Sequence, residues 1–266
     1  MYKISTFKEA ISLLKIFVML FLVLITYTSC NNNTSKNDWR TENLKGKVKS
    51  YTELSYEILE EKKQENHYKK EVKNFDQDGK IINELLYNFD GVGNQFIPKY
   101  NEKNEKTAMY CYVENSDKLI YRWIYSYNEK GLKIKDEIYD ASDKLTLERF
   151  FKYDEKGNKI ERTQKYVYNP DTALNKRTFE YDESGRNIRI NTYDPFGKNI
   201  KSHYDFVYDD GGNKIEENIL NPNGKLTSKW IYKYEFDEKG NWIKKTEFDQ
   251  GIFPKNIIER TYEYYN

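Results

Sequence analysis

Hydrophobic and polar residues alternate along most of the chain from residue 44 onward. The clearest run covers residues 119–127, where one face carries Leu119, Tyr121, Trp123, Tyr125 and Tyr127. Residues 145–153 and 226–236 repeat this pattern with aromatic or aliphatic residues at most alternate positions. Alternation over eight or more residues is typical of a half-buried antiparallel strand, because successive side chains point to opposite faces. The pattern therefore predicts an all-β protein.

A short turn sequence separates these strands and recurs at a nearly constant spacing. It begins with an aromatic residue, continues with Asp or Asn, and usually has Gly three positions later. One set of turns opens 25 to 28 residues apart, at Phe75, Tyr100, Tyr127, Tyr153, Tyr181, Tyr208 and Phe236. A repeat of about 27 residues with two strands is the sequence signature of a β-hairpin array.

The turns of this set, called here the strict turns, alternate with a looser set. The strict turns place Gly at residues 79, 131, 157, 185, 212 and 240, with Asn104 in the same position once. The loose turns read Asp or Asn followed by Ala, Pro or other residues, as at Asp194-Pro195 and Asn221-Pro222. Asp or Asn at the start and Gly at the end predict a type I turn closed by a left-handed residue.

An isoleucine stands three residues after the glycine of nearly every strict turn. These residues are Ile82, Ile134, Ile160, Ile188, Ile215 and Ile243. A four-residue Asp-x-x-Gly loop would pair each Ile with the aromatic residue two before the turn, and a three-residue loop would put them on opposite faces. We therefore predict the four-residue loop, with bulges where the returning strands lose their regular alternation.

Together these features predict an antiparallel meander of β-hairpins that forms a long curved or spiralling sheet. The repeated motif, as in Tyr153-Asp154-Glu155-Lys156-Gly157, resembles the YD repeats of the RHS (rearrangement hotspot) proteins, and the likeness covers residues 44–266. The opening Leu44-Lys45-Gly46-Lys47-Val48 resembles the start of repeat-bearing lipoproteins of uncharacterised function in Bacteroidota. The resemblance implies an architecture; it carries no specific activity.

The first 43 residues differ from the repeats. Residues 16–25 are all apolar, which is too short for a transmembrane helix and suits the apolar part of a signal peptide. Thr28-Ser29-Cys30 resembles a bacterial lipoprotein cleavage site, which implies a signal peptide over residues 1–29 and lipidation of Cys30. We expect residues 30–43 to be a flexible tether and the membrane to be a partner through the lipid. The predicted location is the bacterial cell envelope, with the outer membrane favoured by Asn31.

Composition narrows the function classes. Charged residues make up 33% of the chain, but the net charge is only +1, which gives no electrostatic reason to expect nucleic acid binding. The 25 Tyr, 14 Phe and 4 Trp argue against disorder. We expect most of the Lys and Glu to lie on solvent-facing strand positions.

The sequence shows no catalytic motif. Its two histidines, His67 and His203, belong to no catalytic set, and we expect His203 to be solvated. With Cys30 lipidated, Cys111 remains alone, and its strand-like surroundings predict a small residue in the sheet. We therefore predict a non-enzymatic protein with no catalytic residues, no metal and no cofactor.

Three tryptophans are the candidate ligand-binding residues: Trp123, Trp230 and Trp242. They would form an aromatic surface for a glycan or a protein partner, or they would pack between strands as part of the core. The favoured function is a lipid-anchored scaffold or binding surface of the envelope. The alternatives are a carbohydrate-active envelope enzyme and, by analogy with RHS systems, an immunity or delivery component of a toxin system.

Overall fold

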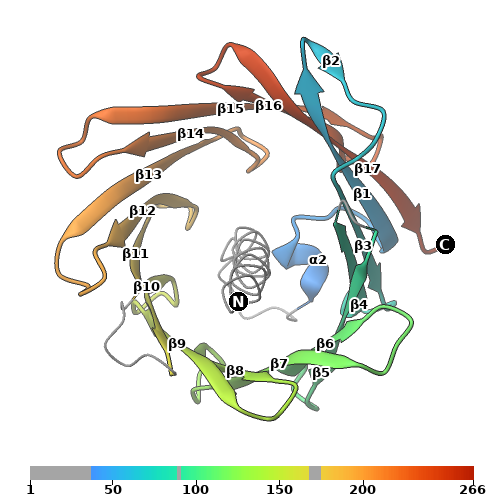
Figure 1. Ribbon diagram of the computed structural model, residues 1–266, viewed down its shortest axis with the longest axis vertical. Helices are drawn as coiled ribbons and strands as arrows, with labels where there is room; N and C mark the ends of the chain where they lie inside the picture. The colour runs from blue at the N-terminus through green and yellow to red at the C-terminus, as the bar shows by residue number, and fades with distance from the viewer. Residues whose placement is uncertain (1–36, 89–90, 168–174) are drawn as a thin grey trace, which may run out of the picture.

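Seventeen strands and one short helix make up the part of the chain that the computed structural model describes, which is residues 37–88, 91–167 and 175–266. All strand pairs are antiparallel, and from β3 to β17 each strand pairs with the next one along the chain (Figure 1). In chain order the elements are α2 (Asp38–Thr41), β1 (Val48–Leu59), β2 (Lys62–Lys63), β3 (Lys69–Phe75), β4 (Ile81–Asn88), β5 (Gly93–Tyr100), β6 (Lys106–Val113), β7 (Leu119–Tyr127), β8 (Lys133–Asp140), β9 (Leu145–Tyr153), β10 (Lys159–Tyr166), β11 (Asn175–Tyr181), β12 (Asn187–Tyr193), β13 (Ile200–Tyr208), β14 (Lys214–Leu220), β15 (Leu226–Phe236), β16 (Trp242–Asp249) and β17 (Phe253–Tyr264).

The sheet closes into a barrel, so the predicted open, spiralling sheet is wrong. β1 pairs with β3 on one side and with β17 on the other, and its register with β17 runs from Val48 opposite Tyr264 to Glu57 opposite Asn256. β2 is a two-residue strand paired with the end of β1, which leaves sixteen strands of the described chain in the wall. Closure removes the two unpaired edges that an open sheet would expose.

The strict turns share one hydrogen-bond pattern, which the turn starting at Asp154 illustrates. Its side-chain Oδ1 accepts from the backbone N–H of Asn158 at 2.7 Å, and its own N–H donates to the carbonyl of Asn158 at 2.9 Å. Gly157 closes the turn with φ +85°, and Asn104 takes the equivalent place in its turn with φ +60°. The prediction of a left-handed residue at the end of each strict turn is confirmed.

The predicted four-residue loop, in contrast, is wrong by one residue. Tyr153 pairs with Lys159, so the loop includes Asn158, and Phe151 pairs with Arg162 rather than with Ile160. Ile160 is the extra residue of a β-bulge and is 39% exposed. The same register shift recurs at the other strict-turn isoleucines. The Asp side chain caps a turn that is one residue longer than predicted, and the bulge then restores the strand alternation.

The helix α2 lies inside the ring of strands, beside β1, β3 and β4 (Figure 1). The backbone N–H groups of Asp38 and Trp39 donate to the carbonyl of Gly79 at 2.7 and 3.2 Å, and the Trp39 indole donates to the carbonyl of Val48 at 2.7 Å. The last part of the predicted tether, residues 37–43, is therefore folded against the inner wall. Residues 30–36 of that tether and the predicted signal peptide, residues 1–29, lie outside the described residues.

Candidate functional site: the inner wall of the barrel

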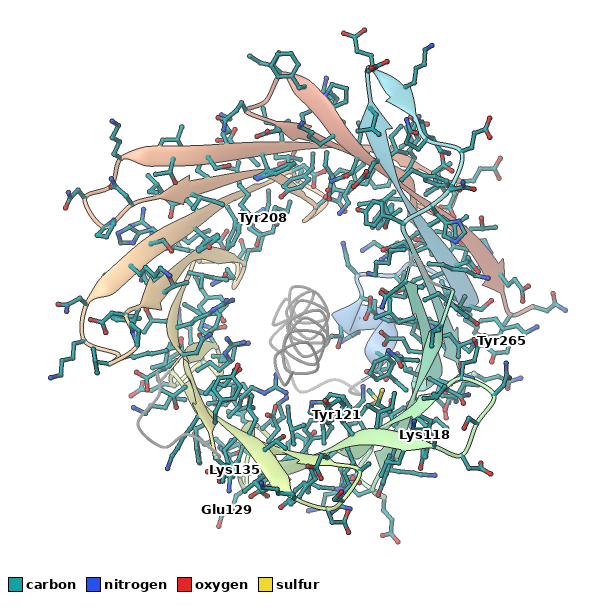
Figure 2. The ribbon with its side chains drawn as sticks, in the orientation of Figure 1. Lys118, Tyr121, Glu129, Lys135, Tyr208 and Tyr265 are labelled. Carbon is teal, nitrogen blue, oxygen red and sulfur yellow. The ribbon has the colours of Figure 1, made fainter. Side chains whose placement is uncertain are left out.

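Strand alternation divides the barrel wall into an inner and an outer face. Tyr121 and Tyr208 point into the barrel and Lys135 points away from it (Figure 2). Residues directly opposite in the register share a face, so the inward face can be followed from strand to strand around the whole ring. The pairing returns to Tyr51 of β1, which lies opposite Tyr262 of β17 on the inward side.

The outward face carries pairs of opposite charge on most strands from β8 to β16. The ion pairs are Lys135–Glu148 at 2.8 Å, Lys152–Glu161 at 2.7 Å, Lys176–Glu161 at 3.2 Å, Arg189–Asp205 at 2.5 Å, Lys229–Glu216 at 2.8 Å and Lys244–Glu235 at 2.7 Å. Lys152 and Glu235 are more than half exposed. The other side chains of these ion pairs are less exposed, but they too lie on the outer face of their strands. This part of the outer wall is therefore a charged surface.

A series of tyrosines ties each hairpin to the one before it. Each hydroxyl donates to the backbone carbonyl of the residue that begins the strand after the preceding strict turn, at 2.7 to 3.0 Å. The pairs are Tyr100–Ile81, Tyr127–Lys106, Tyr153–Lys133, Tyr181–Lys159, Tyr208–Asn187, Tyr234–Lys214 and Tyr262–Trp242. Burial raises the pKa of Tyr153 and Tyr208 to about 12, so both hydroxyls remain donors at neutral pH.

Lysines at the start of several strands lie between aromatic rings of the inner wall. The ammonium of Lys133 is 4.8 Å from the ring centre of Tyr125 and 4.7 Å from that of Phe151. Lys214 has the same arrangement with Phe206 at 5.0 Å and Tyr232 at 4.8 Å. Cation–π contacts at these distances stabilise a charge that is partly removed from water.

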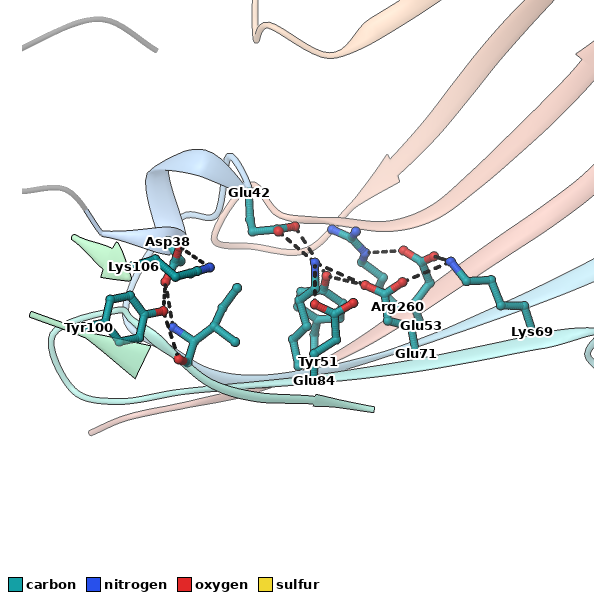
Figure 3. Close-up of polar contacts among 12 residues, drawn as sticks. Asp38, Glu42, Tyr51, Glu53, Lys69, Glu71, Glu84, Tyr100, Lys106 and Arg260 are labelled. Atoms are coloured by element: carbon teal, nitrogen blue, oxygen red, sulfur yellow. Dashed lines mark hydrogen bonds and ion pairs between the residues drawn. The ribbon is translucent and has the colours of Figure 1, made fainter. Parts of the chain in front are cut away.

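A buried network of charges lies where β1 joins β3 and β17, a region that we call the barrel seam (Figure 3). Lys73 is 6% exposed, and its ammonium lies 2.8 Å from Glu42, 3.2 Å from Glu71 and 3.8 Å from Glu84. The Tyr51 hydroxyl donates to Glu71 at 3.1 Å. Glu42 follows helix α2, so this network joins the inner helix to the wall.

Two of the three carboxylates beside Lys73, Glu71 and Glu84, have pKa values shifted in opposite directions. Burial, opposed by Lys73 and reinforced by Glu71 and Glu42, raises the pKa of Glu84 to about 7. Burial also acts to raise the pKa of Glu71, but Lys73 and Lys69 outweigh it and hold that pKa well below its usual range. Glu84 therefore gains a proton at a higher pH than Glu71 does.

Arg260 of β17 extends the network across the closing strand pair. Its Nε donates to Glu53 of β1 at 2.9 Å. Its guanidinium lies over the ring of Tyr51 at 4.4 Å and over that of Trp242 at 3.9 Å. A planar guanidinium combines an ion pair with stacking in this way, which a lysine would not.

The structure separates the three predicted ligand-binding tryptophans. Trp123 is 9% exposed and packs in a core cluster with Phe96 and Met109. Trp230 is partly buried on the inner face, and Trp242 lies under Arg260. No contact among the described residues brings two of them together, and whether they bind a ligand stays a prediction.

Cys30, the predicted lipidation site, lies outside the described residues. Cys111 is 3% exposed within the sheet, as predicted. His203 is partly buried, and its Nδ1 lies 2.6 Å from the Oδ1 of Asn191. Within the described ranges, no group of three His, Cys, Asp or Glu side chains could hold a metal ion, and no helix is long and apolar enough to cross a membrane.

The buried charges are what sequence reasoning missed. Lys73, Glu84 and Arg260 face inward, although the sequence pattern placed most charged residues on the solvent side. Their spacing from apolar residues could have revealed them. Lys73 is two positions from the buried Phe75, and Glu84 is two positions from the buried Leu86, so strand alternation puts each on the same face as its apolar neighbour.

Comparison with known proteins concerns the fold. No protein-family model matches the chain, and no curated protein matches it by sequence. Among solved structures, a porin-like protein from Bacteroides uniformis matches with a TM-score of 0.52 at 11% identity, covering 81% of this chain and 96% of that one. This likeness shows a shared β-barrel fold and nothing finer.

Two further matches are more distant. A porin-like protein from Bacteroides vulgatus has a TM-score of 0.36 at 12% identity and covers 81% of this chain and 98% of its own. The TcdB2–TccC3 crystal structure has a TM-score of 0.32 at 15% identity, and the match covers 86% of this chain but 11% of that one. These values carry no argument, so the YD-repeat resemblance continues to rest on the turn motif.

Proposed function

We propose that this protein is a non-enzymatic binding barrel that a lipid on Cys30 holds at the bacterial cell envelope, with its outer wall in water. The observation that carries the proposal is the ladder of outward ion pairs on β8 to β16, such as Lys135–Glu148 and Arg189–Asp205. A lysine or arginine on the lipid face of a transmembrane barrel costs about 2–4 kcal/mol at the bilayer midplane. A water-exposed wall carries no such cost.

If the outer wall faces water, we propose that the inner wall of the barrel is the surface that binds a ligand. It combines aromatic rings with charged groups, as in the contacts of Lys133 with Tyr125 and Phe151, and these two kinds of group suit a polar ligand. The predicted signal peptide and cleavage site before Cys30 support the envelope location, and an acyl anchor leaves the barrel itself free of the bilayer.

Cleavage of the tether tests this proposal. A protease recognition sequence inserted after Asn33 should let the protease release the whole barrel from isolated membranes without detergent, since only the lipid would hold it. The released barrel should keep its β-sheet circular dichroism spectrum, and the uncut sample serves as control. A barrel that stays with the membranes after complete cleavage would overturn the proposed water-exposed wall.

A further inference from the structure

Five cations gather on the inner face of four neighbouring strands, β8 to β11. We call Lys133, Arg149, Lys159, Arg162 and Arg177 the cationic sector. The register places Arg162 opposite Phe151 on one side and opposite Arg177 on the other. Like charges on directly opposed strand positions repel each other, so this arrangement is unfavourable without a counter-charge.

One carboxylate, Asp136, faces this sector and is already engaged. It is 1% exposed and accepts from the Nε of Arg149 at 2.6 Å and from the ammonium of Lys133 at 3.2 Å. Lys159 and Arg162 have no ion pair with any residue of the described ranges. Lys159 instead lies 4.6 Å from the ring centre of Phe179.

Arg162 is buried and has no ion pair among the described residues. It is 7% exposed, and its Nε has no hydrogen-bond partner among the described residues. Burial, followed by the charges of Arg177 and Arg149, lowers the pKa of Arg162 to about 9. Burial and the neighbouring Lys133, Arg162 and Arg149 likewise lower the pKa of Lys159 to about 8.

The seam network shows that this barrel neutralises its other buried cations. Lys73 has three carboxylates within 4 Å, and Arg260 has Glu53 at 2.9 Å. A buried guanidinium without a partner is costly, because desolvation of a charge is compensated only by a counter-charge and hydrogen bonds. The cationic sector therefore has the properties of a site whose counter-charge comes from a ligand.

We propose that the cationic sector binds the carboxylate or phosphate group of a small anionic molecule inside the barrel, with Arg162 as its central contact. Guanidinium groups hold both oxyanions through paired N–H donors, and Lys159 adds a second positive charge beside it. This inference rests on the proposed function only in taking the inner wall as the binding surface. Its test does not depend on the barrel leaving the membrane.

The experiment uses inorganic phosphate, citrate and acetate as probes, with chloride at equal ionic strength as reference. Thermal unfolding and calorimetric titration of the full-length protein in detergent at pH 7 should show stabilisation by phosphate or by citrate. Arg162→Gln should weaken the binding by about tenfold or more, the loss of one charge-assisted contact. Arg189→Gln, which breaks an outward ion pair, should leave the binding unchanged.

The three probes separate the two sources of the oxyanion. A response to phosphate alone indicates a phosphate-bearing ligand, and a response to citrate and acetate indicates a carboxylate. Equal responses in Arg162→Gln and Arg189→Gln, or no response of the wild type to any probe, would overturn the proposal.

Lys159→Met supplies a second variant in case Arg162→Gln does not fold. This substitution should also weaken the binding, and it allows a second measurement, the pH dependence of stability. The pKa of Lys159 is lower in the folded than in the unfolded chain, so the unfolded state binds more protons between about pH 8 and pH 10.5. Wild-type stability relative to Lys159→Met should therefore rise with pH across that window without anion. If the difference in stability between the wild type and Lys159→Met stayed constant over this pH range, Lys159 would not be an uncompensated charge.

Discussion

Replacing Arg260 with methionine should lower the free energy of unfolding by about 3–5 kcal/mol, the usual cost of removing one partner of a buried ion pair. The side chain of Arg260 is 9% exposed, and that of its partner Glu53 is 13% exposed. The substitution removes the nearer cation of Glu53, leaving Lys69 at 4.0 Å, and it removes the guanidinium from the faces of Tyr51 and Trp242. Urea denaturation followed by circular dichroism measures the loss.

A matched variant on the outer wall gives the control. Arg189 forms an ion pair with Asp205 at 2.5 Å, but the two side chains are 39% and 28% exposed. Exposed pairs contribute about 0–1 kcal/mol, so Arg189→Met should have a small effect. Losses of equal size in the two variants would contradict the assignment of Arg260 to a buried seam and of Arg189 to a water-facing wall.

The second large effect concerns the turn that holds helix α2. Gly79 has φ +81°, and a Cβ at this position would lie 2.5 Å from the ring of Trp39. Gly79→Val should therefore destabilise the protein by about 3 kcal/mol or more, from the left-handed backbone and from the displaced indole together. We expect α2 to leave the inner wall, which hydrogen exchange of residues 38–44 would report.

Gly212→Val separates these two contributions. Gly212 ends another strict turn with φ +80°, but no atom lies within 4 Å of the position its Cβ would take. Only the backbone cost of about 1–2 kcal/mol applies there. If both variants lose the same stability, the contact between Gly79 and Trp39 does not hold the helix.

The local structure was predictable from the sequence because the residues of each turn determine its conformation. The Asp154 side chain caps its turn and Gly157 takes the left-handed conformation, and both roles follow from residue type and spacing. The shared face of Tyr121 and Trp123 followed from strand alternation. The bulge at Ile160 was missed, because the extra residue of the turn and the extra residue of the bulge cancel, so residues from Arg162 onward lie on the face that the four-residue loop predicted.

The closure of the sheet could not be derived in the same way. Whether β1 meets β17 depends on the tilt and stagger accumulated over all the strands, and no single repeat encodes that sum. The inward charges were missed for a related reason. A sheet with one apolar face would keep Lys73 and Arg162 in water, whereas a barrel of this size has an inner wall that accommodates polar side chains.

The closing strand pair gives the most direct test of the barrel. Thr52 of β1 lies opposite Thr261 of β17, and opposed antiparallel residues are about 4.5–5.5 Å apart between Cα atoms, within disulfide range. In a background without the native cysteines, Thr52→Cys with Thr261→Cys should form a disulfide within one chain under mild oxidation. Thr52→Cys with Glu259→Cys, displaced by two residues along β17, should form it poorly. An open sheet predicts the opposite result: no intramolecular disulfide in either variant, because β1 and β17 would be its two separate edges.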